Sequence, residues 1–218
     1  MRNLLVVGFA AVALGAGAVE DGFTSLFDGK TLDGWVVNGG AAEFTVTNGV
    51  IRGVCVPGTP VNTFLCTKRD YTNFVFRAAF KIEGGNSGIQ FRSYVRPHKT
   101  ARHGNLVKGY QSEIRVRGDK CGCIYDECGG RKFFCNTPDE RWQEMQKTFK
   151  VRDWNEMEIR CEGESIRTFV NGLPIADFSD GKEKSGFFGL QIHAQKDPKS
   201  RPGVCSWRDI RVKELPSR

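Results

Sequence analysis

Apolar and polar side chains alternate along most of this chain, in short runs bounded by Gly, Pro, Asn or Asp. Alternation with a period of two is typical of β-strands with one buried face, and no sustained helical period is present. The runs predicted to form strands are Glu43–Val56, Asn73–Glu83, Ser87–Val95, Gly109–Val116, Glu156–Gly163, Ser165–Phe178, Gly186–Ala194 and Ser206–Leu215. About ten short strands in one chain indicate an all-β fold, a two-sheet sandwich.

Two local signals add detail to this pattern. Asn48-Gly49 divides the first run into two halves, and this dipeptide favours a two-residue hairpin turn. The segment Thr137–Gln146 predicts one short helix, with Thr137 as its N-cap and Pro138 in its first turn.

The first eighteen residues have the pattern of a secretory signal peptide. Arg2 precedes an apolar run, Leu4–Leu14, and small residues end the segment at Ala18. The run is too short to cross a bilayer, so no membrane span is predicted. We expect a mature, secreted or periplasmic chain that forms a single domain over residues 19–218.

The charge pattern restricts the class of partner. The formal net charge is +7, and the cations are spread along the chain with acids among them. No basic arm or aromatic-rich basic patch is present, which argues against nucleic acid as a partner. The oligomeric state stays open at this stage.

The cysteine content favours disulfides in an exported protein. The eight cysteines are Cys55, Cys66, Cys121, Cys123, Cys128, Cys135, Cys161 and Cys205. Their spacing lacks the paired C-x2-C knuckles of zinc sites. We expect Cys55 to pair with Cys66 across a hairpin and Cys128 with Cys135 across a turn. Loss of one native disulfide typically costs about 2 to 5 kcal/mol, so reduction should lower stability.

Three of the predicted strands carry long polar side chains on one face. The side chains that share this face are Gln90 and Arg92, then Gln111, Glu113 and Arg115, then Gln191 and His193. A solvated outer face is the alternative, because sheets with one wet side normally show one. Recurring amide and ionisable groups instead favour a hydrogen-bonding surface for a polar ligand, with these residues in one cleft.

Several motifs, in order along the chain, resemble the 3-keto-disaccharide hydrolase domain family. They are FTSLFDGKTLDGW from Phe23, GNSGIQFRS from Gly85, GYQSEI from Gly109, IYDE from Ile124, WNEMEIRCEGESIRTFVNG from Trp154, GFFGLQIH from Gly186 and WRDIRVKEL from Trp207. The resemblance covers nearly the whole mature chain. It implies a concanavalin A-like jelly roll whose concave face binds sugar, in agreement with the sandwich that alternation predicts.

The resemblance also implies a reaction. A ketone at carbon 3 acidifies the proton on carbon 2, so a base can remove that proton and expel the glycosidic oxygen from carbon 1, after which water can add. Glu113 or His193 is then the candidate base, and Arg92 the candidate partner of the enolate oxygen. The residues expected to bind substrate are Gln90, Gln111, Arg115, Glu127 and Gln191.

Two other kinds of chemistry are less favoured. Retaining glucanases on this fold place a second carboxylate where Arg115 stands, which disfavours ordinary retaining hydrolysis. No cofactor is predicted: His193 with Glu113 and Gln191 offers oxygen and nitrogen ligands for a divalent ion, but no dedicated ligand spacing.

Two non-catalytic functions compete with the enzyme. One is a carbohydrate-binding module, and the other is a surface interaction domain held by disulfides. A binding module should place aromatic side chains against the sugar, and the clear candidates are Tyr94, Trp142 and Trp207. Aromatic side chains are scarce on the polar face, which favours an enzyme acting on an oligosaccharide or keto-sugar.

Overall fold

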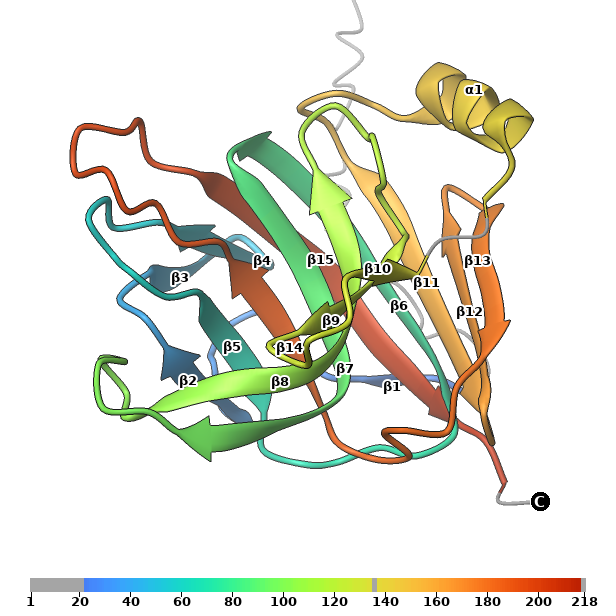
Figure 1. The fold of residues 1–218 in the computed structure, drawn as a ribbon, viewed down its shortest axis with the longest axis horizontal. Coiled ribbons are helices and arrows are strands. Elements are labelled where there is room, and N and C mark those ends of the chain that lie inside the picture. Colours follow the sequence, from blue (N-terminus) through green and yellow to red (C-terminus); the bar gives the residue numbers. More distant parts are fainter. Residues whose placement is uncertain (1–21, 135–136, 217–218) are drawn as a thin grey trace, which may run out of the picture.

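Two antiparallel sheets pack face to face in the computed structural model, which describes residues 22–134 and 137–216 (Figure 1). The 8-stranded sheet has the order β13-β12-β11-β6-β15-β4-β3, with β1 paired to β15. Its strands are β1 (Thr24–Ser25), β3 (Glu43–Thr47), β4 (Val50–Val54), β6 (Phe74–Gly84), β11 (Asn155–Glu162), β12 (Ser165–Val170), β13 (Leu173–Ser179) and β15 (Val204–Glu214). The predicted sandwich is therefore confirmed.

The second sheet has seven strands in the order β10-β9-β8-β7-β14-β5-β2. They are β2 (Trp35–Gly39), β5 (Thr63–Thr67), β7 (Asn86–Pro97), β8 (Asn105–Arg115), β9 (Ile124–Glu127), β10 (Phe133–Phe134) and β14 (Phe187–Ile192).

The predicted signal peptide, residues 1–18, lies outside the described residues. No helix within the described ranges has the length and apolar character needed to cross a membrane.

The hydrophobic core lies between the two sheets. Phe74, Phe76 and Phe80 of β6 are completely buried, and they face Ile89 and Phe91 of β7 together with other apolar side chains of the 7-stranded sheet. Burial of one such side chain typically stabilises a fold by about 1.5 to 3 kcal/mol. The alternate positions of β7, β8 and β14 must consequently point away from the core, to the outer face of the 7-stranded sheet.

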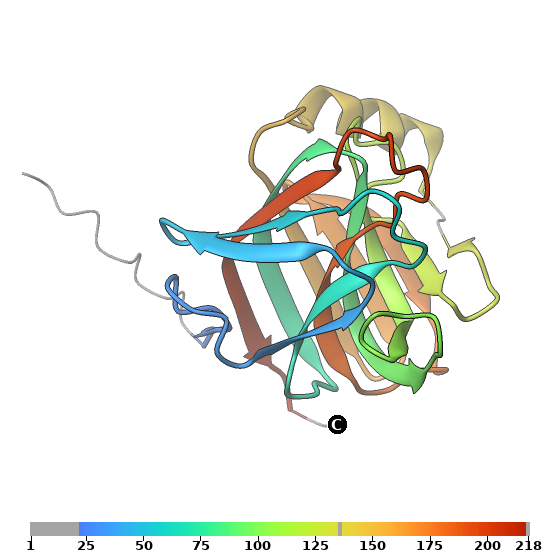
Figure 2. The same ribbon diagram turned by 90° about the vertical axis from the view of Figure 1, so that its left-hand side faces the viewer.

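The hairpin prediction is confirmed and the helix prediction needs one correction. β3 and β4 are joined at Asn48 and Gly49, which both have positive φ as a type I′ turn requires. Helix α1 (Asp139–Thr148) lies at one end of the sandwich, outside the two sheets (Figure 1, Figure 2). Its cap is Pro138, whereas the hydroxyl of Thr137 donates to the carbonyl of Ile175 and does not cap the helix.

Both predicted disulfides are wrong. Cys55 and Cys66 are free and buried, because Cys55 follows β4 in one sheet whereas Cys66 belongs to β5 in the other. Cys128 is also free, and its predicted partner Cys135 lies outside the described residues. Cys123 is disulfide-bonded, but the other described cysteines are free thiols. Because Cys123 is still disulfide-bonded, the expectation that reduction lowers stability stays a prediction.

Candidate functional site

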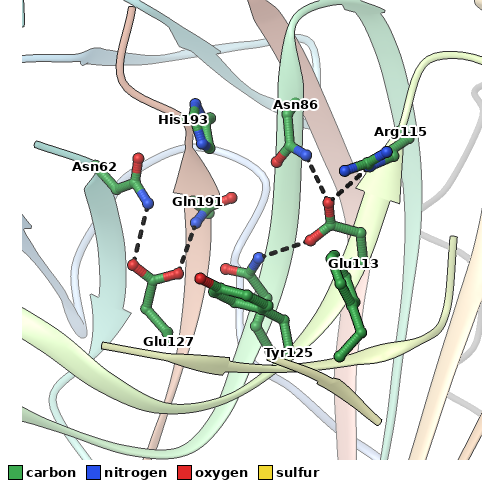
Figure 3. Close-up of a pocket in the computed structure, with 10 residues that line it drawn as sticks. Asn62, Asn86, Glu113, Arg115, Tyr125, Glu127, Gln191 and His193 are labelled. Carbon is green, nitrogen blue, oxygen red and sulfur yellow. Dashed lines mark hydrogen bonds and ion pairs between the residues drawn. The ribbon is translucent and has the colours of Figure 1, made fainter. Parts of the chain in front are cut away.

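A pocket of about 230 Å3 opens on the outer face of the 7-stranded sheet, above β7, β8, β9 and β14 (Figure 3). Six of the eight residues proposed from the sequence line it: Gln111, Glu113, Arg115, Glu127, Gln191 and His193. They come together because the four neighbouring strands have the order β9-β8-β7-β14 in the sheet. The residues that sequence reasoning missed are Asn62, Asn86, Tyr125 and Phe133.

Glu113 is held by hydrogen bonds from three neighbouring side chains. The residue is only 3% exposed. Its carboxylate accepts hydrogen bonds from Asn86 Nδ2 at 2.5 Å, Gln111 Nε2 at 3.0 Å and Arg115 Nε at 3.0 Å. The donor from Arg115 also forms an ion pair with this carboxylate. Glu113 is therefore better suited to orienting its neighbours than to removing a proton from substrate.

A chain of hydrogen bonds approaches Glu113 from beneath the pocket. Ser93 donates its hydroxyl to Gln90 Oε1, Gln90 donates Nε2 to Gln111 Oε1, and Gln111 donates Nε2 to Glu113. All of these side chains are buried. The chain fixes the direction of both amides, and it shows why Gln90 supports the pocket floor without lining it, contrary to the prediction.

Arg92 does not lie in the pocket, so the prediction that it shares a cleft with Glu113 is wrong. The pairing of β7 with β8 shifts register between Phe91 and Tyr94, and Arg92 has a φ of 45°. This bulge breaks the alternation on which the prediction rested. The guanidinium is fully buried and donates from Nε and Nη2 to the carbonyl of Thr72, at 3.0 and 2.7 Å. Arg92 thus has a structural role.

Glu127 differs from Glu113 in its electrostatic environment. Burial raises the pKa of its carboxyl from 4.5 to about 7, although hydrogen bonds from Asn62 Nδ2 and the Cys128 thiol oppose the shift. The charges of Glu113 and Asp126 add to the increase in pKa. Glu127 therefore retains a proton in a large share of molecules at neutral pH, as a general acid requires.

His193 follows β14 at the exposed side of the pocket. Its Nδ1 lies 2.8 Å from the carbonyl oxygen of Ala194. Since a carbonyl only accepts, Nδ1 carries the proton of the neutral ring, and the lone pair is on Nε2. Nε2 makes no hydrogen bond to another described residue, so it is available as a base.

The opposite side of the pocket carries donors and an aromatic pair. Arg115 binds Glu113 through Nε and Asp119 through Nη1, and its guanidinium carbon lies 5.8 Å from the ring centroid of Phe133. The Tyr125 and Phe133 rings pack with their centroids 5.1 Å apart. Burial raises the pKa of the Tyr125 hydroxyl, so this group stays protonated and can donate.

The predicted aromatic platforms lie elsewhere. Trp207 is fully buried in the core, and neither Tyr94 nor Trp142 lines the pocket. Two of the missed residues follow from parity, since Asn86 lies on the Gln90 face of β7 and Tyr125 on the Glu127 face of β9. Asn62 precedes β5 in a loop, and no sequence signal marks it or Phe133.

The described ranges contain no group of three His, Cys, Asp or Glu side chains placed to hold a metal ion. The side chains that line the pocket offer amide, carboxyl, imidazole, phenol and guanidinium groups for hydrogen bonding. Such a set suits a neutral, hydroxyl-rich ligand.

Residues 22–213 match the sequence profile of the 3-keto-α-glucoside-1,2-lyase-like domain. The match confirms the resemblance to 3-keto-disaccharide hydrolase domains and spans nearly all of the described chain. None of the curated proteins matches significantly.

Solved structures confirm the concanavalin A-like fold. A candidate glycosyl hydrolase from Parabacteroides distasonis is 20% identical, with a TM-score of 0.60 over 90% of this chain and 95% of its own. The carbohydrate-binding module CBM66 from Bacillus subtilis is 17% identical, with a TM-score of 0.56 over 83% of this chain and 96% of its own. A galectin-like protein of unknown function from Bacillus subtilis is 12% identical, with a TM-score of 0.62 over 90% and 96%.

Proposed function

This chain belongs to the 3-keto-α-glucoside-1,2-lyase-like domain family, and from that premise we propose that it cleaves 3-keto-glycosides by β-elimination. The observation that carries the proposal is the pairing, in one pocket, of a base with a free lone pair and a carboxyl that stays protonated near neutral pH. These groups are His193 Nε2 and Glu127. Groups whose environments assign them opposite proton-transfer roles characterise acid–base sites.

In the proposed reaction His193 Nε2 removes the proton on carbon 2, which the neighbouring ketone acidifies. Negative charge then develops on the ketone oxygen, where the Arg115 guanidinium and the Tyr125 hydroxyl can donate hydrogen bonds. Collapse of the enolate forms the double bond between carbons 1 and 2 and expels the glycosidic oxygen. Glu127 protonates that oxygen as it leaves.

Glu113 supports this arrangement without taking part in proton transfer. Its carboxylate holds Asn86 and Arg115 in place, and its charge raises the pKa of Glu127. This assignment replaces Arg92 with Arg115 as the partner of the enolate oxygen. The proposal also includes export through the signal peptide predicted at residues 1–18.

A carbohydrate-binding module is the second candidate. The Tyr125 and Phe133 rings line the pocket, and aromatic rings commonly pack against sugars. A module of this kind would use the same hydroxyl-binding groups but would release no product.

The test is a comparison of two substrates, a 3-keto-glycoside with a chromophoric aglycone and its unoxidised parent. We expect the keto compound to release its aglycone, and the parent to release it at least about a thousandfold more slowly. Without the ketone the proton on carbon 2 is not acidic, and no ketone oxygen can carry the negative charge that develops when it is removed. Binding of either sugar without release would support the binding module. Equal release from both would contradict elimination.

A further inference from the structure

Two amide oxygens in the pocket have no hydrogen-bond partner among the described residues. They are Oδ1 of Asn86 and Oε1 of Gln191, and both atoms are buried. The Gln191 side chain as a whole is 0% exposed. A buried acceptor without a partner destabilises a fold, so two of them in one pocket indicate a place where a ligand donates hydrogen bonds.

The nitrogen of each amide faces a carboxyl group. Asn86 donates Nδ2 to Glu113 at 2.5 Å, and Gln191 donates Nε2 to Glu127 at 3.5 Å. Rotation of the Asn86 amide by 180° would turn Oδ1 toward the Glu113 carboxylate, which only accepts hydrogen bonds. The amide oxygens must therefore point into the remaining space, and Figure 3 shows them directed toward the region between the two side chains.

The strand register places the two amides beside each other and beside the proposed base. Gln191 pairs with Gly88, so Asn86 is its diagonal neighbour on the same face of β7. Side chains in this relation are about 7 to 8 Å apart at the backbone and can meet above the sheet. The backbone N–H of His193 donates to the carbonyl of Asn86, which places His193 next to the pair.

We propose that Asn86 Oδ1 and Gln191 Oε1 together bind one water molecule, by accepting both of its protons, and that this water adds to the elimination product. The inference rests on the proposed function and decides whether the enzyme is a lyase or a hydrolase. Both atoms can only accept, so the ketone oxygen of the sugar cannot bind there. A single water molecule can donate one hydrogen bond to each of the two acceptors, whereas a single sugar hydroxyl can donate only one hydrogen bond in total.

The addition balances with the groups already assigned. After elimination Glu127 is ionised and His193 is protonated. The water oxygen forms a bond to carbon 1, one water proton passes to Glu127, and His193 returns its proton to carbon 2 as the double bond is consumed. The product is the free 3-keto sugar, and both residues regain their starting protonation.

The test measures how product divides between the conjugated enone, followed by its ultraviolet absorbance, and the free 3-keto sugar, followed by NMR in 18O-labelled water. We expect the wild type to release mainly 18O-labelled 3-keto sugar. Gln191→Met should raise the enone fraction at least about tenfold, since losing one hydrogen bond to the water costs about 1 to 1.5 kcal/mol. The same variant should hydrate added enone more slowly by a similar factor.

Asn38→Leu is the matched control, because it removes a buried amide from the same sheet, outside the pocket, whose oxygen already accepts from Asn105. This change should leave the product ratio as in the wild type, whatever its effect on stability. An unchanged ratio in Gln191→Met, with or without a rise in KM, would overturn the inference and assign the oxygens to sugar hydroxyls. Release of enone alone by the wild type would overturn it while the proposed elimination stands. Absence of any cleavage would instead reject the proposed function itself.

Discussion

Replacement of His193 by glutamine is expected to reduce turnover of a 3-keto-glycoside by at least about a hundredfold, because general-base catalysis typically contributes about 10²- to 10⁴-fold. Stability should change little. The side chain is exposed, and its hydrogen bond goes to the adjacent residue, Ala194. Steady-state kinetics and thermal melting of the same preparation measure the two effects.

His103→Gln is the matched control for this substitution. His103 is exposed and does not line the pocket, so this variant should keep wild-type turnover. Full activity in His193→Gln would assign the base to another group, with Glu113 the remaining candidate from the sequence. A hundredfold loss in both variants would point to a general effect of histidine replacement and not to a base at the pocket.

Replacement of Glu127 by glutamine should lower turnover and should also change how the stability of the protein depends on pH. Loss of the proposed acid should lower turnover by about a hundredfold or more. The folded-state pKa of about 7 lies above the ordinary 4.5, so the folded protein binds this proton more tightly than the unfolded chain does. The stability that this adds is fully present below about pH 4.5 and is lost as the pH rises through about 7.

The size of the stability effect follows from the shift. About 2.5 pKa units correspond to about 3 kcal/mol of unfolding free energy. The unfolding free energy of the wild type, measured relative to that of Glu127→Gln, should therefore fall by up to about 3 kcal/mol between pH 4.5 and pH 8. Urea unfolding of both proteins at each pH measures this difference. A difference that is independent of pH would contradict the raised pKa. Retained turnover would contradict the role as acid.

Alternation predicted the face of a side chain wherever the strand is regular. Gln111, Glu113 and Arg115 lie on β8 within an uninterrupted pairing to β7, and all three line the pocket as expected. The same reasoning failed at Arg92 because a bulge with positive φ interrupts β7 there. The sequence does not predict this bulge, because arginine rarely adopts positive φ.

Other parts of the site depend on contacts between distant segments. Asn62 reaches the pocket from a loop before β5 and donates to Glu127, a contact between residues far apart in sequence. The predicted pairing of Cys55 with Cys66 failed for a related reason, because the sequence did not show that the two cysteines belong to different sheets. Periodicity assigns a face to a strand, but only the sheet order assigns its neighbours.

The most direct test of elimination is the fate of the hydrogen on carbon 2. A 3-keto-glycoside labelled with deuterium at that carbon should be cleaved more slowly than the unlabelled compound, because His193 must break that bond. The label should also pass to solvent, because the imidazole that takes it up is exposed and exchanges its N–H with water before a proton returns to carbon 2. Release of the aglycone at the same rate from both compounds, with the label fully retained in the sugar, would contradict the account, since direct displacement at carbon 1 leaves carbon 2 untouched.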